Sequence, residues 1–182
     1  MKDIRDSIEA AGAVGAVRAA RAAAAGVAIA LAAIGGVAAA AGALSAYNGK
    51  VVNLRESAPT SLDAKDMADW VKANRVTGRA QTAPGEWTLN LFTVFKTKPG
   101  MPKVILLLYD KKDPESIKKR EPIEAEEITV PTDATLFTTT VTITEGMGFN
   151  PEHKYLIRFV AATSKTERIL SEGEIALVKS AP

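Results

Sequence analysis

The chain carries one histidine, His153, and no cysteine, and these two facts limit the chemistry available to it. An ordinary zinc site needs several histidine or cysteine ligands, so no zinc site is expected. His153 would also have to be the base of any Ser-His-Asp arrangement, and no serine lies in a Gly-x-Ser-x-Gly pattern. Because His153 follows Pro151 in a turn, we expect it to be solvated.

Other patterns that could bind a ligand are also weak. The Gly146-Met147-Gly148 segment is not followed by a helical pattern, so it does not predict a phosphate-binding loop. Segment 110–127 carries acidic residues that could bind calcium, but basic residues interrupt them, and a solvated charged loop is the better interpretation. The acidic residues are Asp110, Asp113, Glu121, Glu124, Glu126 and Glu127, and the basic ones are Lys111, Lys112, Lys118, Lys119 and Arg120. We therefore predict no catalytic, cofactor-binding or metal-binding residue and no enzymatic activity.

The overall charge gives no indication of a nucleic-acid partner. Lysine and arginine number 23 against 21 acidic residues, a net charge of +2. Nucleic-acid-binding domains concentrate positive charge far more strongly, so no such partner is predicted. With no cysteine available for disulfides, the folded domain must be held together by its core, which a domain of about a hundred residues can achieve.

From Gly85 to the C-terminus the sequence alternates between apolar and polar residues, which is typical of β-strands. Turn residues separate the strands, and segment 164–167 is the predicted tip of the last hairpin. The predicted fold class is mainly β, with a sandwich of six or seven antiparallel strands over residues 85–182. The predicted strands are Trp87–Phe95, Lys103–Tyr109, Ile123–Val130, Thr135–Thr144, Lys154–Ala161 and Glu174–Val178.

One local motif leads into the Lys154–Ala161 strand. Phe149, Pro151 and Tyr155 are spaced like the residues of a tyrosine corner. In this motif the segment resembles fibronectin type III and other immunoglobulin-like domains. The resemblance implies an immunoglobulin-like sandwich in which the Tyr155 hydroxyl bonds back to the corner, with Pro151 and Phe149 as structural residues.

Residues 48–84 form a predicted connector. Asn48-Gly49 ends the preceding helix, and Leu62–Ala73 has the pattern of a short amphipathic helix capped by Thr60 or Ser61. Trp70 either packs on the β domain or rests at a bilayer surface, and we favour packing. Alternatively, 70–79 is the first strand of the sandwich.

The N-terminal part of the chain has the composition of a membrane helix. No charged residue occurs from Ala22 to Gly49, a run of 28 residues. As a helix this run is about 42 Å long, enough for a hydrocarbon core of about 30 Å. Alanine makes the run only weakly apolar, so three interpretations compete: an uncleaved signal anchor at 22–47, which we favour, a cleaved signal peptide, and a water-soluble helix packed in an oligomer.

The residues that flank this run predict its orientation. Arg18 and Arg21 precede it and Tyr47 lies near its other end, where all three suit the membrane boundary. Since positive charge accumulates on the cytoplasmic side, residues 1–21 are predicted to be a short cytoplasmic segment and the β domain to be periplasmic. Small residues at four-residue spacing predict helix association within lipid, and they are Gly35, Gly36, Ala39 and Ala40.

Together these patterns predict a bacterial inner-membrane protein with an exported β-sandwich that binds or scaffolds another protein component. The expected partners are membrane lipid and either a protein or further copies of the chain, joined through the Ala/Gly-rich helix. One alternative is a structural subunit of a particle or filament whose Ala-rich helix packs against itself. A weaker alternative is a secreted binding domain released by signal cleavage.

Overall fold

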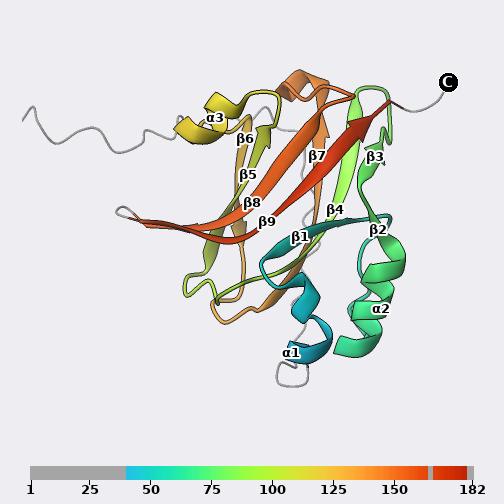
Figure 1. Cartoon of the computed structure of the whole chain (residues 1–182), viewed down its shortest axis with the longest axis vertical. Coiled ribbons are helices and arrows are strands. Elements are labelled where there is room, and N and C mark those ends of the chain that lie inside the picture. Colours follow the sequence, from blue (N-terminus) through green and yellow to red (C-terminus); the bar gives the residue numbers. More distant parts are fainter. Residues whose placement is uncertain (1–39, 164–165, 180–182) are drawn as a thin grey trace, which may run out of the picture.

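The computed structural model describes residues 40–163 and 166–179 (Figure 1). This part of the chain is mainly β, as predicted, and its strands form one curled sheet in the order β6-β5-β8-β9-β1-β4-β7, with β2 paired to β1 and β3 paired to β9. The strands are β1 Lys50–Leu54, β2 Arg75–Val76, β3 Gly78–Ala80, β4 Glu86–Val94, β5 Lys103–Asp110, β6 Glu124–Thr129, β7 Leu136–Thr144, β8 Lys154–Ala162 and β9 Glu167–Val178.

The pairing is not antiparallel throughout, which corrects one prediction. β9 runs parallel to both β1 and β3, while the other pairs are antiparallel. The parallel pairs arise because segment 48–84 is not a simple connector: it supplies β1, β2 and β3 to the sheet. β9 and β1 approach so closely that a Cβ on Gly173 would lie 2.1 Å from the Val51 carbonyl oxygen, and only glycine fits there.

The main core lies inside the curled sheet. It is built from the inward-facing residues of the strands, with Trp87, Phe149, Tyr155 and Phe159 fully buried. The indole Nε1 of Trp87 donates to the Val178 carbonyl at 3.0 Å, so a side chain of β4 is bonded to the end of β9. Alternating apolar residues on neighbouring strands create this core, because successive side chains point to opposite faces of a sheet.

A second apolar cluster lies on the outer face of β1 and β4, beneath helix α2, Ala64–Asn74. Trp70 packs against it partly buried, as favoured from the sequence. The helix begins later than predicted, because its N-cap is Asp63: this carboxylate accepts hydrogen bonds from Lys65 N and Asp66 N, both at 2.9 Å. The buried members of the second cluster are Leu44, Leu54, Met67, Val71 and Phe92.

The described chain enters the fold through a short helix, α1, Ala40–Ala43, and a 3-10 turn, η1, Ser45–Tyr47. Leu44 is only 4% exposed, and the Tyr47 ring meets the Phe92 ring edge-on at 6.0 Å. The predicted membrane helix 22–47 thus does not continue to Tyr47. Within residues 40–163 and 166–179, no helix has the length and apolar character needed to cross a bilayer.

Several predicted features lie outside the described residues. They are Arg18, Arg21, Gly35, Gly36 and Ala39, together with residues 22–39 of the predicted span and the centre of the predicted hairpin tip, 164–165. Ala40 is the first residue of α1.

The charged segment 110–127 is more ordered than a solvated loop. It contains helix α3, Pro114–Lys119, and the start of β6. Asp113 caps the helix by accepting from Ser116 N at 3.2 Å, and Arg120 closes it in the left-handed conformation at φ 59°. A second 3-10 turn, η2, Glu145–Met147, follows β7.

Candidate functional site

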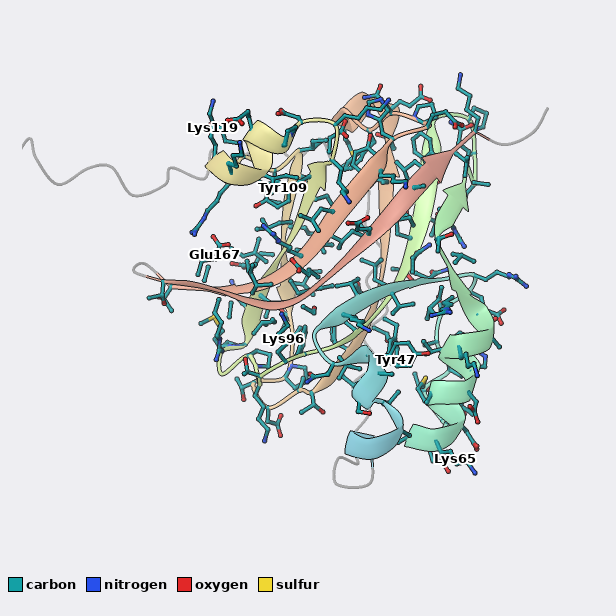
Figure 2. The ribbon with its side chains drawn as sticks, in the orientation of Figure 1. Tyr47, Lys65, Lys96, Tyr109, Lys119 and Glu167 are labelled. Atoms are coloured by element: carbon teal, nitrogen blue, oxygen red, sulfur yellow. The ribbon has the colours of Figure 1, made fainter. Side chains whose placement is uncertain are left out.

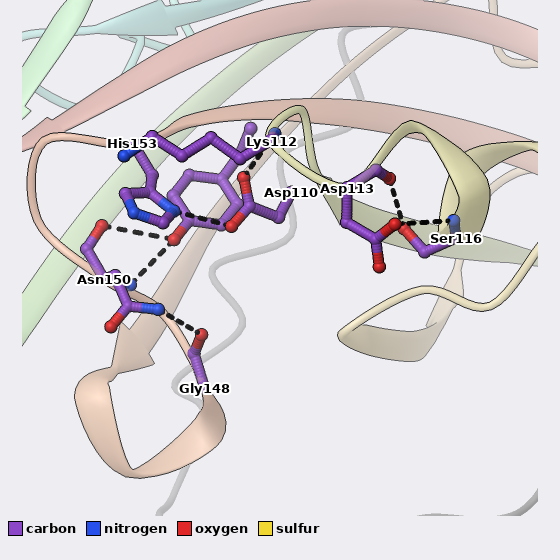
Figure 3. Close-up of polar contacts among 8 residues, drawn as sticks. Asp110, Lys112, Asp113, Ser116, Gly148, Asn150 and His153 are labelled. Carbon is purple, nitrogen blue, oxygen red and sulfur yellow. Dashed lines mark hydrogen bonds and ion pairs between the residues drawn. The ribbon is translucent and has the colours of Figure 1, made fainter.

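The turn before β8 is closed by the hydroxyl of Tyr155. This oxygen accepts a hydrogen bond from Asn150 N at 2.7 Å and donates to the Asn150 carbonyl at 3.2 Å (Figure 3). The rings of Tyr155 and Phe149 are 5.1 Å apart and both residues are fully buried, whereas Pro151 is partly exposed. Burial raises the pKa of Tyr155, so the hydroxyl keeps its proton and both bonds.

His153 lies next to this corner and is paired rather than solvated. Its Nδ1 is 2.6 Å from Oδ2 of Asp110, and the two side chains are 22% and 15% exposed. The other carboxylate oxygen of Asp110 accepts from Lys112 N at 2.8 Å (Figure 3). The expectation of a solvated histidine is therefore wrong, because the end of β5 places a carboxylate beside the turn.

An imidazole paired with a carboxylate supplies two of the three members of a Ser-His-Asp triad. A triad also needs a nucleophilic hydroxyl bonded to the imidazole. In the described part of the chain no hydroxyl is bonded to the His153 ring. The nearby Ser116 instead donates to the Asp113 carbonyl at 2.8 Å, within the cap of α3, and the Tyr155 hydroxyl is bonded to Asn150. As arranged, the Asp110–His153 pair ties the end of β5 to the corner.

Some charges of segment 110–127 are paired with one another or with β9. Lys111 pairs with Glu174, Lys118 with Glu115, and Arg120 with Glu167 at 3.5 Å. No group of three or more His, Asp or Glu side chains in residues 40–163 and 166–179 is arranged to hold a metal ion.

The outer face of β5 and β8 carries a third apolar cluster, formed by Leu107, Tyr109 and Val160. The Arg158 guanidinium lies 5.8 Å from the centre of the Tyr109 ring, and Arg158 Nε donates to Glu172 at 3.2 Å. Burial raises the pKa of Tyr109, and the charge of Glu167 adds to this effect. The stacked arginine covers the ring and leaves little apolar surface open there.

A small hollow lies on the outer face of β4 and β7. Asn90 Oδ1 accepts from Thr140 Oγ1 at 3.0 Å and from Ser57 Oγ at 3.3 Å, so three polar side chains of the hollow bond to one another. Its lining consists of Ser57, Ala58, Thr60, Asn90, Leu91, Thr138, Thr139 and Thr140.

Sequence reasoning missed both polar groupings. Asp110 and His153 are 43 positions apart, and Thr140 and Asn90 are 50 apart. No local pattern could have joined them, since strand pairing alone brings such positions together. No protein-family model matches the chain, and no curated protein or solved structure is significantly similar to it.

Proposed function

We propose that this chain is a non-enzymatic, membrane-anchored envelope protein whose β domain is an immunoglobulin-like sandwich that binds or scaffolds another protein. The observation that carries the proposal is the junction at Leu44. The uncharged run that begins at Ala22 leads directly into the folded domain, because Leu44 and Tyr47 pack in the second apolar cluster. A membrane segment here would hold the domain against the bilayer with no linker between them.

The sandwich assignment is supported by the strand order. One half of the curled sheet contains β6, β5, β8 and β9, and the other contains β1, β4 and β7. The main core lies between these halves, and the tyrosine-bonded corner immediately precedes β8. Two layers around one apolar core are the basis of immunoglobulin-like folds.

A binding role is favoured over catalysis by how the reactive groups are used. The only imidazole of the chain is bonded to Asp110 within a structural corner. α3 and the charged segment around it lie at the end of the domain opposite α1 and carry exposed lysines such as Lys119 (Figures 1 and 2). This end is the surface that we assign to a protein partner with complementary charge.

The orientation follows from the charges that flank the uncharged run. Four basic residues precede it, Lys2, Arg5, Arg18 and Arg21, and two follow closely, Lys50 and Arg55. Positive charge is retained on the cytoplasmic side, so the N-terminus stays inside and the sandwich is exported.

Fractionation of bacteria that express the full chain tests the anchor. The chain should stay with membranes in alkaline carbonate, and a reporter fused to its C-terminus should report the periplasm. Ile34→Lys, which places a charge within the uncharged run, should release the chain from the membrane. Thr129→Lys makes the same gain of positive charge at an exposed position outside the run and should not. A wild-type chain that carbonate extracts would contradict the anchor.

A second candidate function is a particle or filament subunit whose Ala-rich helix packs against copies of itself. It is favoured by the small residues Gly35, Gly36, Ala39 and Ala40, whose spacing lets helices approach closely. The Gly36→Leu, Ala40→Leu double variant should lower the oligomeric mass of the full chain measured in detergent. An unchanged mass would remove this candidate.

A further inference from the structure

Strand β7 ends the strand order on one side, and within residues 40–163 and 166–179 it pairs only with β4. Two bonds show how its backbone is turned: Phe95 N donates to Thr135 O, and Glu145 N donates to Gly85 O, both at 2.9 Å. In an antiparallel pair such bonds involve every second residue. The even-numbered residues of β7 therefore direct their N–H and C=O groups away from β4, and they are Leu136, Thr138, Thr140, Thr142 and Thr144.

The two outer strands of the sheet are protected to different degrees. β6, on the other side, has only six residues and includes Glu124, Glu126 and Glu127. Charged and short edge strands resist pairing with a further strand. β7 has nine residues, none of them charged, and five are threonine. β7 is thus the outer strand that charge protects less, although Thr138, one of its outward-directed residues, is only 8% exposed.

We infer that β7 pairs with β7 of a second copy of this chain, antiparallel and centred on Thr140. In this register Thr140 faces its own symmetry mate, Thr138 faces Thr142, and Phe137 faces Ile143. Threonine pairs and aromatic to β-branched pairs stabilise neighbouring strands, and no like charges meet. The register also places even-numbered residues opposite each other, so the groups directed away from β4 face their partners.

The strand is held in the conformation that this pairing needs. Thr140 Oγ1 donates to Asn90 Oδ1 at 3.0 Å and lies 3.4 Å from Ser57 Oγ, so its side chain is fixed on the outer face. Phe137, Val141 and Ile143 are buried on the inner face. An edge that is already extended and anchored loses little conformational freedom when a partner strand binds.

The pairing has a consequence for the whole assembly. Leu136 packs against the second apolar cluster, which contains Leu44, whereas Thr144 lies at the other end of β7. In an antiparallel pair the two α1 segments therefore lie at opposite ends, about 30 Å apart along the strands. Two copies anchored in one bilayer can pair only if β7 lies along the membrane plane. The inference itself does not depend on the anchor, because it concerns the edge of the sheet.

Cysteine cross-linking of the full chain in detergent tests the inference directly, since the native sequence has no cysteine. Residues facing each other in a hydrogen-bonded antiparallel pair have Cα atoms about 5.5 Å apart, which suits a disulfide. Thr140→Cys should therefore form a disulfide-linked dimer under mild oxidation. Thr142→Cys should not, because its symmetry mate lies about 13 Å away along the strand.

Thr142→Cys is the matched control because Thr140 and Thr142 are both partly exposed, and Thr129→Cys, at an exposed position on the other outer strand, measures random collision between thiols. A Thr140→Cys dimer yield no higher than that of Thr129→Cys or Thr142→Cys would overturn the inference, and so would a disulfide to a different polypeptide at position 140. As a second measurement, Thr140→Lys should abolish the dimer because it places two like charges together, while Thr129→Lys should leave it intact. A dimer that survives Thr140→Lys would also overturn the inference.

Discussion

The Tyr155 hydroxyl is the most extensively bonded single group at the corner before β8. It forms hydrogen bonds with both the N–H and the C=O of Asn150, which the turn brings together. Each of these backbone groups would otherwise need water or another partner. The hydroxyl therefore determines how the chain enters β8 and where His153 meets Asp110.

Tyr155→Phe should lower the free energy of unfolding by about 0.5–1.5 kcal/mol, because the N–H and C=O of Asn150 lose a part-buried hydrogen-bond partner. Urea denaturation monitored by tryptophan fluorescence measures this change. Tyr47→Phe is the matched control, since the Tyr47 ring packs on Phe92 and its hydroxyl has no bond within the described residues. Equal effects of the two substitutions would show that the corner bonds contribute no stability.

At the scale of elements, the two outer strands differ in charge. The charges that protect β6 from pairing with a further strand also lower its stability. Burial raises the pKa of Glu126 above its usual 4.5, and the neighbouring charge of Glu124 raises it further. A raised carboxyl pKa means that the folded state binds a proton more tightly than the unfolded chain. Stability from this group is therefore present at low pH and is lost as the pH rises through the folded-state pKa.

Glu126→Gln should accordingly raise the free energy of unfolding at pH 7, because the neutral amide is not penalised by burial as a charge is. The gain should shrink as the pH falls toward 4, where Glu126 itself becomes neutral. Urea midpoints measured across this pH range check the effect. The control Glu56→Gln, at an exposed position, should show no such trend. A gain in stability for Glu126→Gln that grows at low pH would contradict the raised pKa of Glu126.

At the scale of the whole molecule, the second apolar cluster joins the N-terminal segment to the β domain. Leu44 and Tyr47 come from the segment through which the described chain enters the fold. Met67 and Val71 come from α2, and Phe92 comes from β4. Because Leu44 is buried and Tyr47 is partly buried in this cluster, chymotrypsin should cut poorly after Tyr47 in the native protein.

Leu44→Asp should expose this junction, since a carboxylate cannot remain within an apolar cluster. Cleavage after Tyr47 should then become fast under native conditions, as followed by gel electrophoresis and intact mass. Ala46→Asp introduces the same charge at an exposed neighbouring position and should leave cleavage slow. Rapid cleavage in the unmodified chain would mean that the junction is not part of the domain.

Local patterns predicted much of the sheet. β4, β5, β6, β7 and β8 agree with the predicted strands to within one residue at each end. β4 and β7 were identified by their alternation, because one face of each is buried in the main core, and β5 by its nearly continuous apolar run. β1 was missed because it is short, and the first half of β9 because Glu167–Ile169 is exposed and does not alternate.

By itself the sequence determined the mainly β character of the domain, the five strands β4 to β8 and the absence of cysteine chemistry, since these depend on composition and on the spacing of neighbouring residues. Tertiary structure alone decided that β1 joins β9, that His153 meets Asp110, and that β7 ends the strand order of the described residues. Each of these results brings together residues distant in the chain. Such contacts depend on which strands become neighbours, and local periodicity carries no information about that choice.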